Sequence, residues 1–279
     1  MTEAKRLSGK VAVVTGAGRR GGLGAAIAAR LFREGAAVVL SDVSAPIDPA
    51  TAVDRPAYRS EIETLAAEMG EGGVSTFVAD VREFGQMRAL ADHAVAVHGG
   101  LDIWVNNAGI GSIMKPLLEV TPEDWGKVID VNLTGAFFGL RAAADVMVAQ
   151  GRGGRIVNIA SQAAKSGFTH AQAYCASKHG LVGLVRSAAV ELGAFGITVN
   201  NVCPNHVTTG LGAWQNEYFA GVTGHASVDS YLAAMRARIP MGRTGLPEDT
   251  AGVVAFLCSD DAGYVTGESM NVSGGEETH

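Results

Sequence analysis

Apolar positions along the chain form short β-branched runs that alternate with longer segments of helical spacing. Several runs are apolar throughout, which is typical of parallel strands that helices cover on both faces. Between them, apolar residues recur at helical intervals, as at Leu23, Ile27 and Leu31, and Gly35 follows as a stop signal. These repeated strand–helix units predict an α/β Rossmann fold, a doubly wound seven-stranded parallel sheet flanked by helices. The seven predicted strands are residues 11–15, 37–41, 75–79, 103–106, 155–160, 198–202 and 269–272.

Two segments interrupt this alternation. Residues 44–60, SAPIDPATAVDRPAYRS, contain three prolines and predict a loop insertion after the second strand. Residues 205–247 are rich in glycine and aromatic side chains, and we expect them to form a lid or a substrate loop. Because no internal repeat and no linker divides the chain, we predict one domain over residues 1–279.

Charge and composition argue against several classes of protein. Lys and Arg total 22 against 28 Asp and Glu, so the chain lacks the basic face that nucleic acids and anionic membrane surfaces require. The start, MTEAKRLSGK, has no apolar signal-peptide core, and no apolar run reaches the ~18 residues of a membrane span. Cys175, Cys203 and Cys258 form no C-x-x-C pair. We therefore expect a cytoplasmic protein with no metal site and no disulfide framework.

The stretch TGAGRRGGLG at residues 15–24 joins a predicted strand to a predicted helix. It contains two glycine patterns, one through Gly16, Gly18 and Gly21 and one through Gly18, Gly22 and Gly24. A helix N-terminus offers unpaired N–H groups and a partial positive charge to a pyrophosphate, and glycines let the backbone approach it closely. The context indicates a dinucleotide site, and the alternative is a glycine-rich turn without a ligand.

Asp42 follows the second predicted strand and favours NAD over NADP. In dinucleotide folds a carboxylate at that strand end hydrogen-bonds the adenosine ribose hydroxyls, and it would repel a 2′-phosphate. Arg19 and Arg20 favour the opposite choice, because guanidinium groups recognise phosphate. The alternatives are an ordinary turn carboxylate for Asp42 and a solvated loop tip for the two arginines.

Ser161, Tyr174 and Lys178 suggest proton-transfer chemistry. Tyr174 and Lys178, in YCASK, share one helix face, where an ammonium would lower the pKa of the phenol. Y-x-x-x-K alone is a common pattern, but Ser161 ends a strand-like run, and strand carboxyl ends carry the ligands of doubly wound folds. Asn132 lies within a predicted helix, where we expect it either to cap a kink or to hold a water.

Taken together and in order, these residues resemble the short-chain dehydrogenase/reductase family over nearly the whole chain. The resemblance rests on TGAGRRGGLG, Asp42, Asp80-Val81, NNAG at 106–109, Asn132, Ser161, YCASK, NNVCPNHVTT at 200–209, RTGLPED at 243–249 and YVTGESMNVSGG at 264–275.

The resemblance implies a role for each matching residue. Tyr174 would be the general acid/base, Lys178 would lower its pKa and hold the nicotinamide ribose, and Ser161 would orient the substrate oxygen. Asn132 would anchor a water of the proton relay. The cofactor contacts would come from Gly16, Gly22, Leu23, Asp42, Asp80, Val81, Asn107, Ala108, Gly109, Tyr174, Lys178, Pro204, Val207 and Thr209. The family also implies a homotetramer.

Three features depart from the family pattern. The glycine loop is two residues longer than usual, so we assign Gly16 to the turn, Gly22 to the helix start and Gly24 to close helix–strand packing. Pro204-Asn205 replaces the usual Pro-Gly, and Asn is the next-best residue for a left-handed backbone. The insertion at 44–60 is longer than the family norm, and we expect it to affect packing or cofactor access rather than chemistry.

The lid segment contains a local group of aromatic residues, Trp214, Tyr218, Phe219 and Tyr231. With Phe168 and His206, Trp214 and Tyr218 are candidates for the substrate pocket. We expect an apolar, ring-bearing substrate. The alternatives are that the aromatic residues pack the lid onto the body or a second subunit, and that only the backbone of His206 matters.

The leading hypothesis is an NAD(H)-dependent oxidoreductase that interconverts a small-molecule secondary alcohol and a ketone. An NADP(H)-dependent 3-oxoacyl-thioester reductase is the second hypothesis, and Asp42 and the aromatic lid count against it. A third hypothesis, a scaffold that binds NAD without turnover, conflicts with the presence of Ser161, Tyr174 and Lys178.

Overall fold

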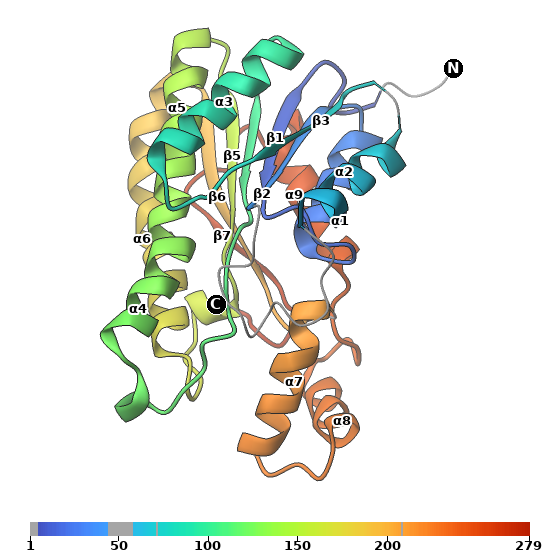
Figure 1. Ribbon diagram of the computed structural model, residues 1–279, viewed down its shortest axis with the longest axis vertical. Coiled ribbons are helices and arrows are strands. Elements are labelled where there is room, and N and C mark those ends of the chain that lie inside the picture. The colour runs from blue at the N-terminus through green and yellow to red at the C-terminus, as the bar shows by residue number, and fades with distance from the viewer. Residues whose placement is uncertain (1–4, 44–57, 71, 208) are drawn as a thin grey trace.

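Seven parallel strands form one sheet in the order β3-β2-β1-β4-β5-β6-β7, which confirms the predicted doubly wound fold (Figure 1). The computed structural model describes residues 5–43, 58–70, 72–207 and 209–279, with only the backbone described at 58–60 and 210–214. The strands are β1 (Val11–Thr15), β2 (Ala37–Asp42), β3 (Val74–Val78), β4 (Ile103–Asn106), β5 (Gly154–Ile159), β6 (Ile197–Pro204) and β7 (Ser269–Val272).

Helices cover both faces of the sheet, as the continuous apolar strands predict. All of β1 is buried, and its residues alternate between two cores. Val11 and Val13 pack against helices on one face, and Ala12 and Val14 against helices on the other. The first face carries α3 (Phe84–His98), α5 (Gly135–Gln150) and α6 (Gln172–Leu192), and the second carries α1 (Leu23–Arg33), α2 (Tyr58–Met69) and α9 (Pro247–Cys258) (Figure 1).

A long helical run at Pro122–Gln150 joins α4 (Pro122–Ile129), a π-helical turn at Asp130–Thr134, and α5. Its length and mean hydropathy would allow it to span a membrane, but 56% of its most apolar window is buried inside the protein. Since α5 packs on α3 and on the sheet, the apolar character of this run is that of a core helix.

The carboxyl ends of β1 and β4 define the point where the strand order reverses. From β1 the chain builds the sheet outward through β2 and β3, and from β4 it builds in the opposite direction. The connections leaving β1 and β4 therefore diverge, and they leave a crevice at this edge of the sheet.

The segment expected as a lid is mainly helical. It contains α7 (Gly210–Val222) and α8 (Val228–Arg238), which pack together beyond the carboxyl ends of the strands (Figure 1). Ala220, Tyr231 and Met235 form their shared core. The loop predicted at residues 44–60 extends too far, because α2 already begins at Tyr58. Residues 44–57 lie outside the described part of the chain.

Candidate active site

The glycine loop is held by Asn107, at the start of the connection after β4. The Asn107 side-chain amide donates to the carbonyl oxygens of Thr15 and Gly16, both at 2.9 Å. The Thr15 hydroxyl in turn accepts from the backbone N–H groups of Asn107 and Ala108, at 3.1 and 3.2 Å. These bonds bring the ends of β1 and β4 together and fix where the loop begins.

Glycine is required at two positions of this loop by close contacts. Gly16 has a φ of +65°, and a Cβ there would lie 2.6 Å from the Cα of Ala108. A Cβ on Gly24 would overlap the carbonyl oxygen of Gly16 and the Asn107 amide. Gly22 is the N-cap of α1, and within the described residues no side-chain cap bond is made at this helix start. The loop thus has the turn, the exposed helix N-terminus and the close packing that we assigned to these glycines, and a pyrophosphate fits that arrangement.

The two arginines of the loop point in different directions. The Arg20 guanidinium forms a two-pronged ion pair with Glu68 of α2, at 2.8 and 2.9 Å. Its backbone N–H donates to Glu61 of the same helix, and both bonds lie at an exposed surface. Arg19 instead lines the cleft described below. Only Arg19 is therefore placed to meet a bound cofactor.

Asp42 ends β2 and faces the glycine loop. One carboxylate oxygen accepts the backbone N–H of Gly18 at 2.7 Å, and the other accepts that of Val43 at 2.8 Å. Burial raises the pKa of Asp42, and the two N–H donors oppose that shift. Asp42 therefore supports the loop and also presents a carboxylate to the cleft.

A cleft of about 570 Å³ extends from the glycine loop to α7 and α8. It brings together most of the residues that the sequence indicated. Those lining it are Gly16, Gly22, Leu23, Asp42, Val81, Asn107, Ala108, Gly109, Ser161, Phe168, Tyr174, Lys178, Pro204, His206, Val207 and Thr209.

Tyr174, Ser161 and Lys178 meet in this cleft. Burial raises the pKa of Tyr174, and a hydrogen bond with Ser161 partly opposes the shift. Lys178 is 5% exposed, its Nζ donates to the carbonyl of Ile159 at 2.8 Å, and it lies 5.6 Å from the Tyr174 ring centroid. Burial lowers the pKa of Lys178 to about 8. The expected lowering of the Tyr174 pKa is therefore wrong for this arrangement, because desolvation of the phenol outweighs the other contributions.

Asn132 lies behind the cleft within the π-helical turn. Its side chain accepts the backbone N–H of Ile110 at 2.8 Å and donates to the Ile110 carbonyl at 2.9 Å and to the Ser177 hydroxyl at 3.2 Å. Ser177 donates in turn to the carbonyl of Tyr174 at 2.7 Å. Asn132 thus links the connection after β4 to the helix that carries Tyr174. A π-helical turn inside a longer helix is a frequent mark of a functional position.

Besides Asn132, three expected site residues are not placed in the cleft lining. The Asp80 carboxylate is paired with the Arg82 guanidinium at 2.6 Å, beside the lining residue Val81. The Tyr218 hydroxyl lies 2.8 Å from the ring nitrogen of His170. The side chain of Trp214 lies outside the described residues.

The Asn205 backbone does not use the left-handed conformation that an asparagine tolerates. Among the described non-glycine residues only His170 has a positive φ. The reason is that Asn205 continues from β6, with its N–H donating to the Val272 carbonyl at 3.2 Å, and its side chain bonds to Glu276. Burial lowers the pKa of the neighbouring His206, which lines the cleft.

Sequence reasoning missed part of the lining at the α7–α8 end of the cleft. Gln162 and Ser166 follow Ser161 closely in the chain, but they belong to no motif and no periodic pattern. Phe219, four residues after Gln215 on α7, was visible as a lid aromatic residue. The missed residues include Gln162, Ser166, Thr169, Gln215, Asn216, Leu232, Met235 and Arg238.

Comparison with known proteins identifies the family. A family model described as enoyl-(acyl carrier protein) reductase matches residues 16–277. Galactitol 2-dehydrogenase of Agrobacterium fabrum is 36% identical over 276 residues, covering 97% of this chain and 98% of the relative. 3beta-Hydroxysteroid dehydrogenase 1 of Eggerthella lenta is 38% identical over 274 residues, covering 96% and 94%. The chain belongs to the short-chain dehydrogenase/reductase family.

A solved short-chain dehydrogenase/reductase structure has the same fold and a bound cofactor. Carveol dehydrogenase from Mycobacterium avium, in complex with NAD, aligns with a TM-score of 0.88 and 32% identity, covering 98% of this chain and 99% of that one. Short-chain dehydrogenase/reductases use NAD(P) as their cofactor. The cleft suits such a cofactor, because the uncapped start of α1 and the glycine cradle lie at one end of it.

Stability should depend on pH through Lys178. Its pKa is 10.5 in the unfolded chain and about 8 when folded, so burial of its charge costs about 3 kcal/mol. Below pH 8 both states are charged and the full cost applies; between pH 8 and 10.5 the folded state loses its proton first and the cost fades. The melting temperature of Lys178→Met should therefore exceed that of the wild type. This difference should be largest at pH 7 and should shrink by pH 10. A difference that stays constant across that range, measured by scanning calorimetry, would contradict the buried charge.

Proposed function

We propose that the protein is an NAD(H)-dependent oxidoreductase that interconverts a secondary alcohol and a ketone. The observation that carries the proposal is the meeting of Ser161, Tyr174 and Lys178 in one cleft that also contains Asp42 and the glycine loop. Bound NAD(H) would supply the acceptor or donor of hydride. The chain's own residues would orient the substrate and move one proton.

The proton would pass through the Tyr174 hydroxyl. Ser161, already hydrogen-bonded to Tyr174, would hold the substrate oxygen beside it. In ketone reduction Tyr174 would donate its proton to that oxygen, and in alcohol oxidation it would take the proton back. A protonated Lys178 would favour the phenolate by its charge. Asn132, bonded to Ile110 and Ser177, would anchor the water through which the proton exchanges with solvent.

Asp42 would select NAD over NADP. A carboxylate in that position accepts hydrogen bonds from ribose hydroxyls, whereas a 2′-phosphate would meet a buried negative group. Arg20 is bound to Glu68, so Arg19 is the remaining basic residue of the loop that lines the cleft. The NAD-bound relative supports the same choice.

The substrate would be an apolar, ring-bearing alcohol or ketone. Phe168 lies with its ring centroid 6.4 Å from that of Tyr174 and 5.9 Å from that of Phe219, and both phenylalanines line the cleft. Leu232 and Met235 of α8 add apolar surface to the same end. The hydroxysteroid dehydrogenase among the relatives supports this class, whereas the galactitol dehydrogenase shows that the fold also accepts polyols.

The remaining proposals concern architecture and location. We propose that residues 1–279 act as one domain, with α7 and α8 as the lid over the substrate. A homotetramer is supported by large apolar side chains exposed on the helices of one face, such as Trp125, Phe137 and Val190. We keep the cytoplasm as the proposed location.

Tyr174→Phe should abolish turnover while sparing cofactor binding. Removing the hydroxyl removes the proton donor, so kcat should fall by at least about 100-fold. NADH binding, followed by fluorescence, should change little. Tyr218→Phe is the matched control and should retain most activity, since Tyr218 does not line the cleft. Retained activity of Tyr174→Phe, with the reduced cofactor followed by absorbance, would refute the mechanism.

Asp42→Ser should shift the enzyme from NAD towards NADP. Loss of the carboxylate removes a ribose contact and a repulsion, so the ratio of kcat/KM for NAD to that for NADP should fall at least about tenfold, or about 1.4 kcal/mol. Arg20→Ala should leave the ratio unchanged, because its guanidinium is bound to Glu68. If the wild type prefers NADP, the assignment of Asp42 is wrong and a 3-oxoacyl-thioester reductase becomes the better hypothesis.

Phe219→Ala should weaken ring-bearing substrates selectively. Loss of one aromatic contact should lower kcat/KM about three- to tenfold for a cyclic or aryl alcohol, and less for a small aliphatic alcohol. Phe195→Ala, at an exposed position outside the cleft lining, is the control. Equal losses for both substrates would contradict the proposed substrate class.

A further inference from the structure

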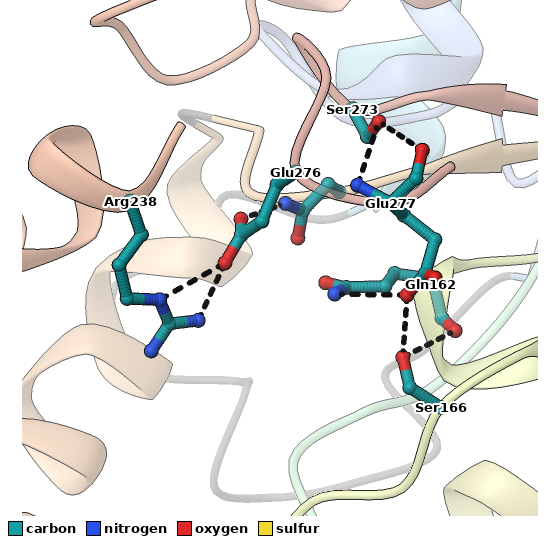
Figure 2. Close-up of polar contacts among 7 residues, drawn as sticks. Gln162, Ser166, Arg238, Ser273, Glu276 and Glu277 are labelled. Atoms are coloured by element: carbon teal, nitrogen blue, oxygen red, sulfur yellow. Dashed lines mark hydrogen bonds and ion pairs between the residues drawn. The ribbon is translucent and has the colours of Figure 1, made fainter. Parts of the chain in front are cut away.

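The turn from Ser273 to Glu277 lies between Arg238 on one side and Gln162 and Ser166 on the other (Figure 2). The Ser273 hydroxyl donates to the Glu277 carbonyl at 3.0 Å and accepts the Glu277 N–H at 3.2 Å. The Asn271 side chain donates to the same carbonyl at 3.1 Å. These bonds close a turn that places the carboxylates of Glu276 and Glu277 on different segments of the cleft wall.

Glu277 binds the segment that follows Ser161. Its carboxylate accepts the Ser166 hydroxyl at 2.8 Å and the Gln162 amide at 3.3 Å, as Figure 2 shows. Glu277 is 7% exposed, while Gln162 and Ser166 line the cleft. The hydrogen bond from Ser166 is the main cause that lowers the pKa of Glu277, so the carboxylate is charged at neutral pH. Gln162 adjoins Ser161, so Glu277 holds the side chain of the residue that follows Ser161.

Glu276 binds the opposite wall. One carboxylate oxygen accepts hydrogen bonds from Nε and Nη2 of Arg238, at 3.0 and 2.5 Å. The other accepts a hydrogen bond from the side-chain amide of Asn205 (Figure 2). The Glu276 side chain is 9% exposed and that of Arg238 62%, so the carboxylate is the fixed partner of the pair. Arg238 ends α8, which carries Leu232 and Met235 into the cleft, so Glu276 ties this lid helix to the end of β6.

We propose that Glu276 and Glu277 are positioning residues that set the width and alignment of the substrate half of the cleft. Neither lines the cleft, so each acts through cleft residues: Glu276 through Arg238 and Asn205, and Glu277 through Gln162 and Ser166. The inference rests on the proposed function, because it takes this half of the cleft as the alcohol or ketone site. It also explains Asn205, since a glycine there would leave the second oxygen of Glu276 without its amide donor.

The two carboxylates act on different steps. Glu276 holds the lid helix and the end of β6, so its loss weakens substrate binding. Glu277 holds the residues next to Ser161, so its loss also misplaces the group that orients the reacting oxygen. The glycine loop and Asp42 lie at the other end of the cleft, so the adenosine end of the cofactor site keeps its contacts and the affinity for the cofactor should change little.

The test compares Glu276→Gln and Glu277→Gln with Asp260→Asn in the full-length protein. Asp260 is an exposed carboxylate paired with Arg155 at 3.6 Å, near the opposite ends of the strands, and serves as the matched control. With an alcohol that the wild type oxidises, Glu276→Gln should raise KM about tenfold with kcat nearly unchanged. Glu277→Gln should lower kcat/KM about tenfold with part of the loss in kcat. The Kd for NADH should stay within about twofold of the wild type in both variants.

Partner variants keep the test decisive if either glutamine variant folds poorly. Ser166→Ala should reproduce the loss of Glu277→Gln, and Arg238→Ala should reproduce that of Glu276→Gln. Each double variant should lose no more than its worse single variant, because both changes remove one contact. Additive losses, or glutamine variants within about twofold of Asp260→Asn in kcat and KM, would overturn the inference while the proposed function stands. A wild type that turns over no alcohol or ketone with either cofactor would overturn the proposed function and this inference with it.

Discussion

The hydrogen bonds between Asn107 and the end of β1 are the contact on which the rest of the site depends. The carbonyl oxygens of Thr15, which ends β1, and of Gly16, which follows it, both accept hydrogen bonds from the one Asn107 side-chain amide. This contact draws the connection after β4 so close to Gly16 that no side chain fits there. Gly24, in the first turn of α1, packs against the same Asn107 amide, and Asp42 binds the loop two residues further on at Gly18.

A second constraint is the burial of charge beside the reacting groups. The Lys178 ammonium donates to the carbonyl oxygen of Ile159 and lies over the Tyr174 ring, and burial shifts the pKa values of both Lys178 and Tyr174 towards the neutral forms. Burying these groups costs stability. A costly arrangement of this kind at the centre of a cleft is typical of a functional site rather than of a structural ion pair. Asn132, in the π-helical turn, supports the same group of residues. Its side chain bonds both the backbone of Ile110 and Ser177 on the helix that carries Tyr174.

Much of the fold could be predicted because its signals are local. Continuous apolar runs separated by helical spacing identified all seven strands to within two residues. The glycine loop and the Ser161, Tyr174 and Lys178 group were visible because each depends on strand ends and helix faces, which periodicity reveals. The lid was harder: its helices pack mainly on each other, so the glycine and aromatic content indicated a loop where α7 and α8 occur.

What the sequence determined by itself was the order of elements, the edge of the sheet that carries the site, and the family. The tertiary structure decided which way individual polar side chains point. Arg19 and Arg20 are neighbours with the same chemistry, yet only the position of Glu68 on α2 separates their roles. Asn205 resembled a substitute for a turn glycine, until Glu276, 71 residues further along the chain, was found bonded to its side chain. Such pairings depend on distances between segments that are remote in sequence, and no local pattern encodes them.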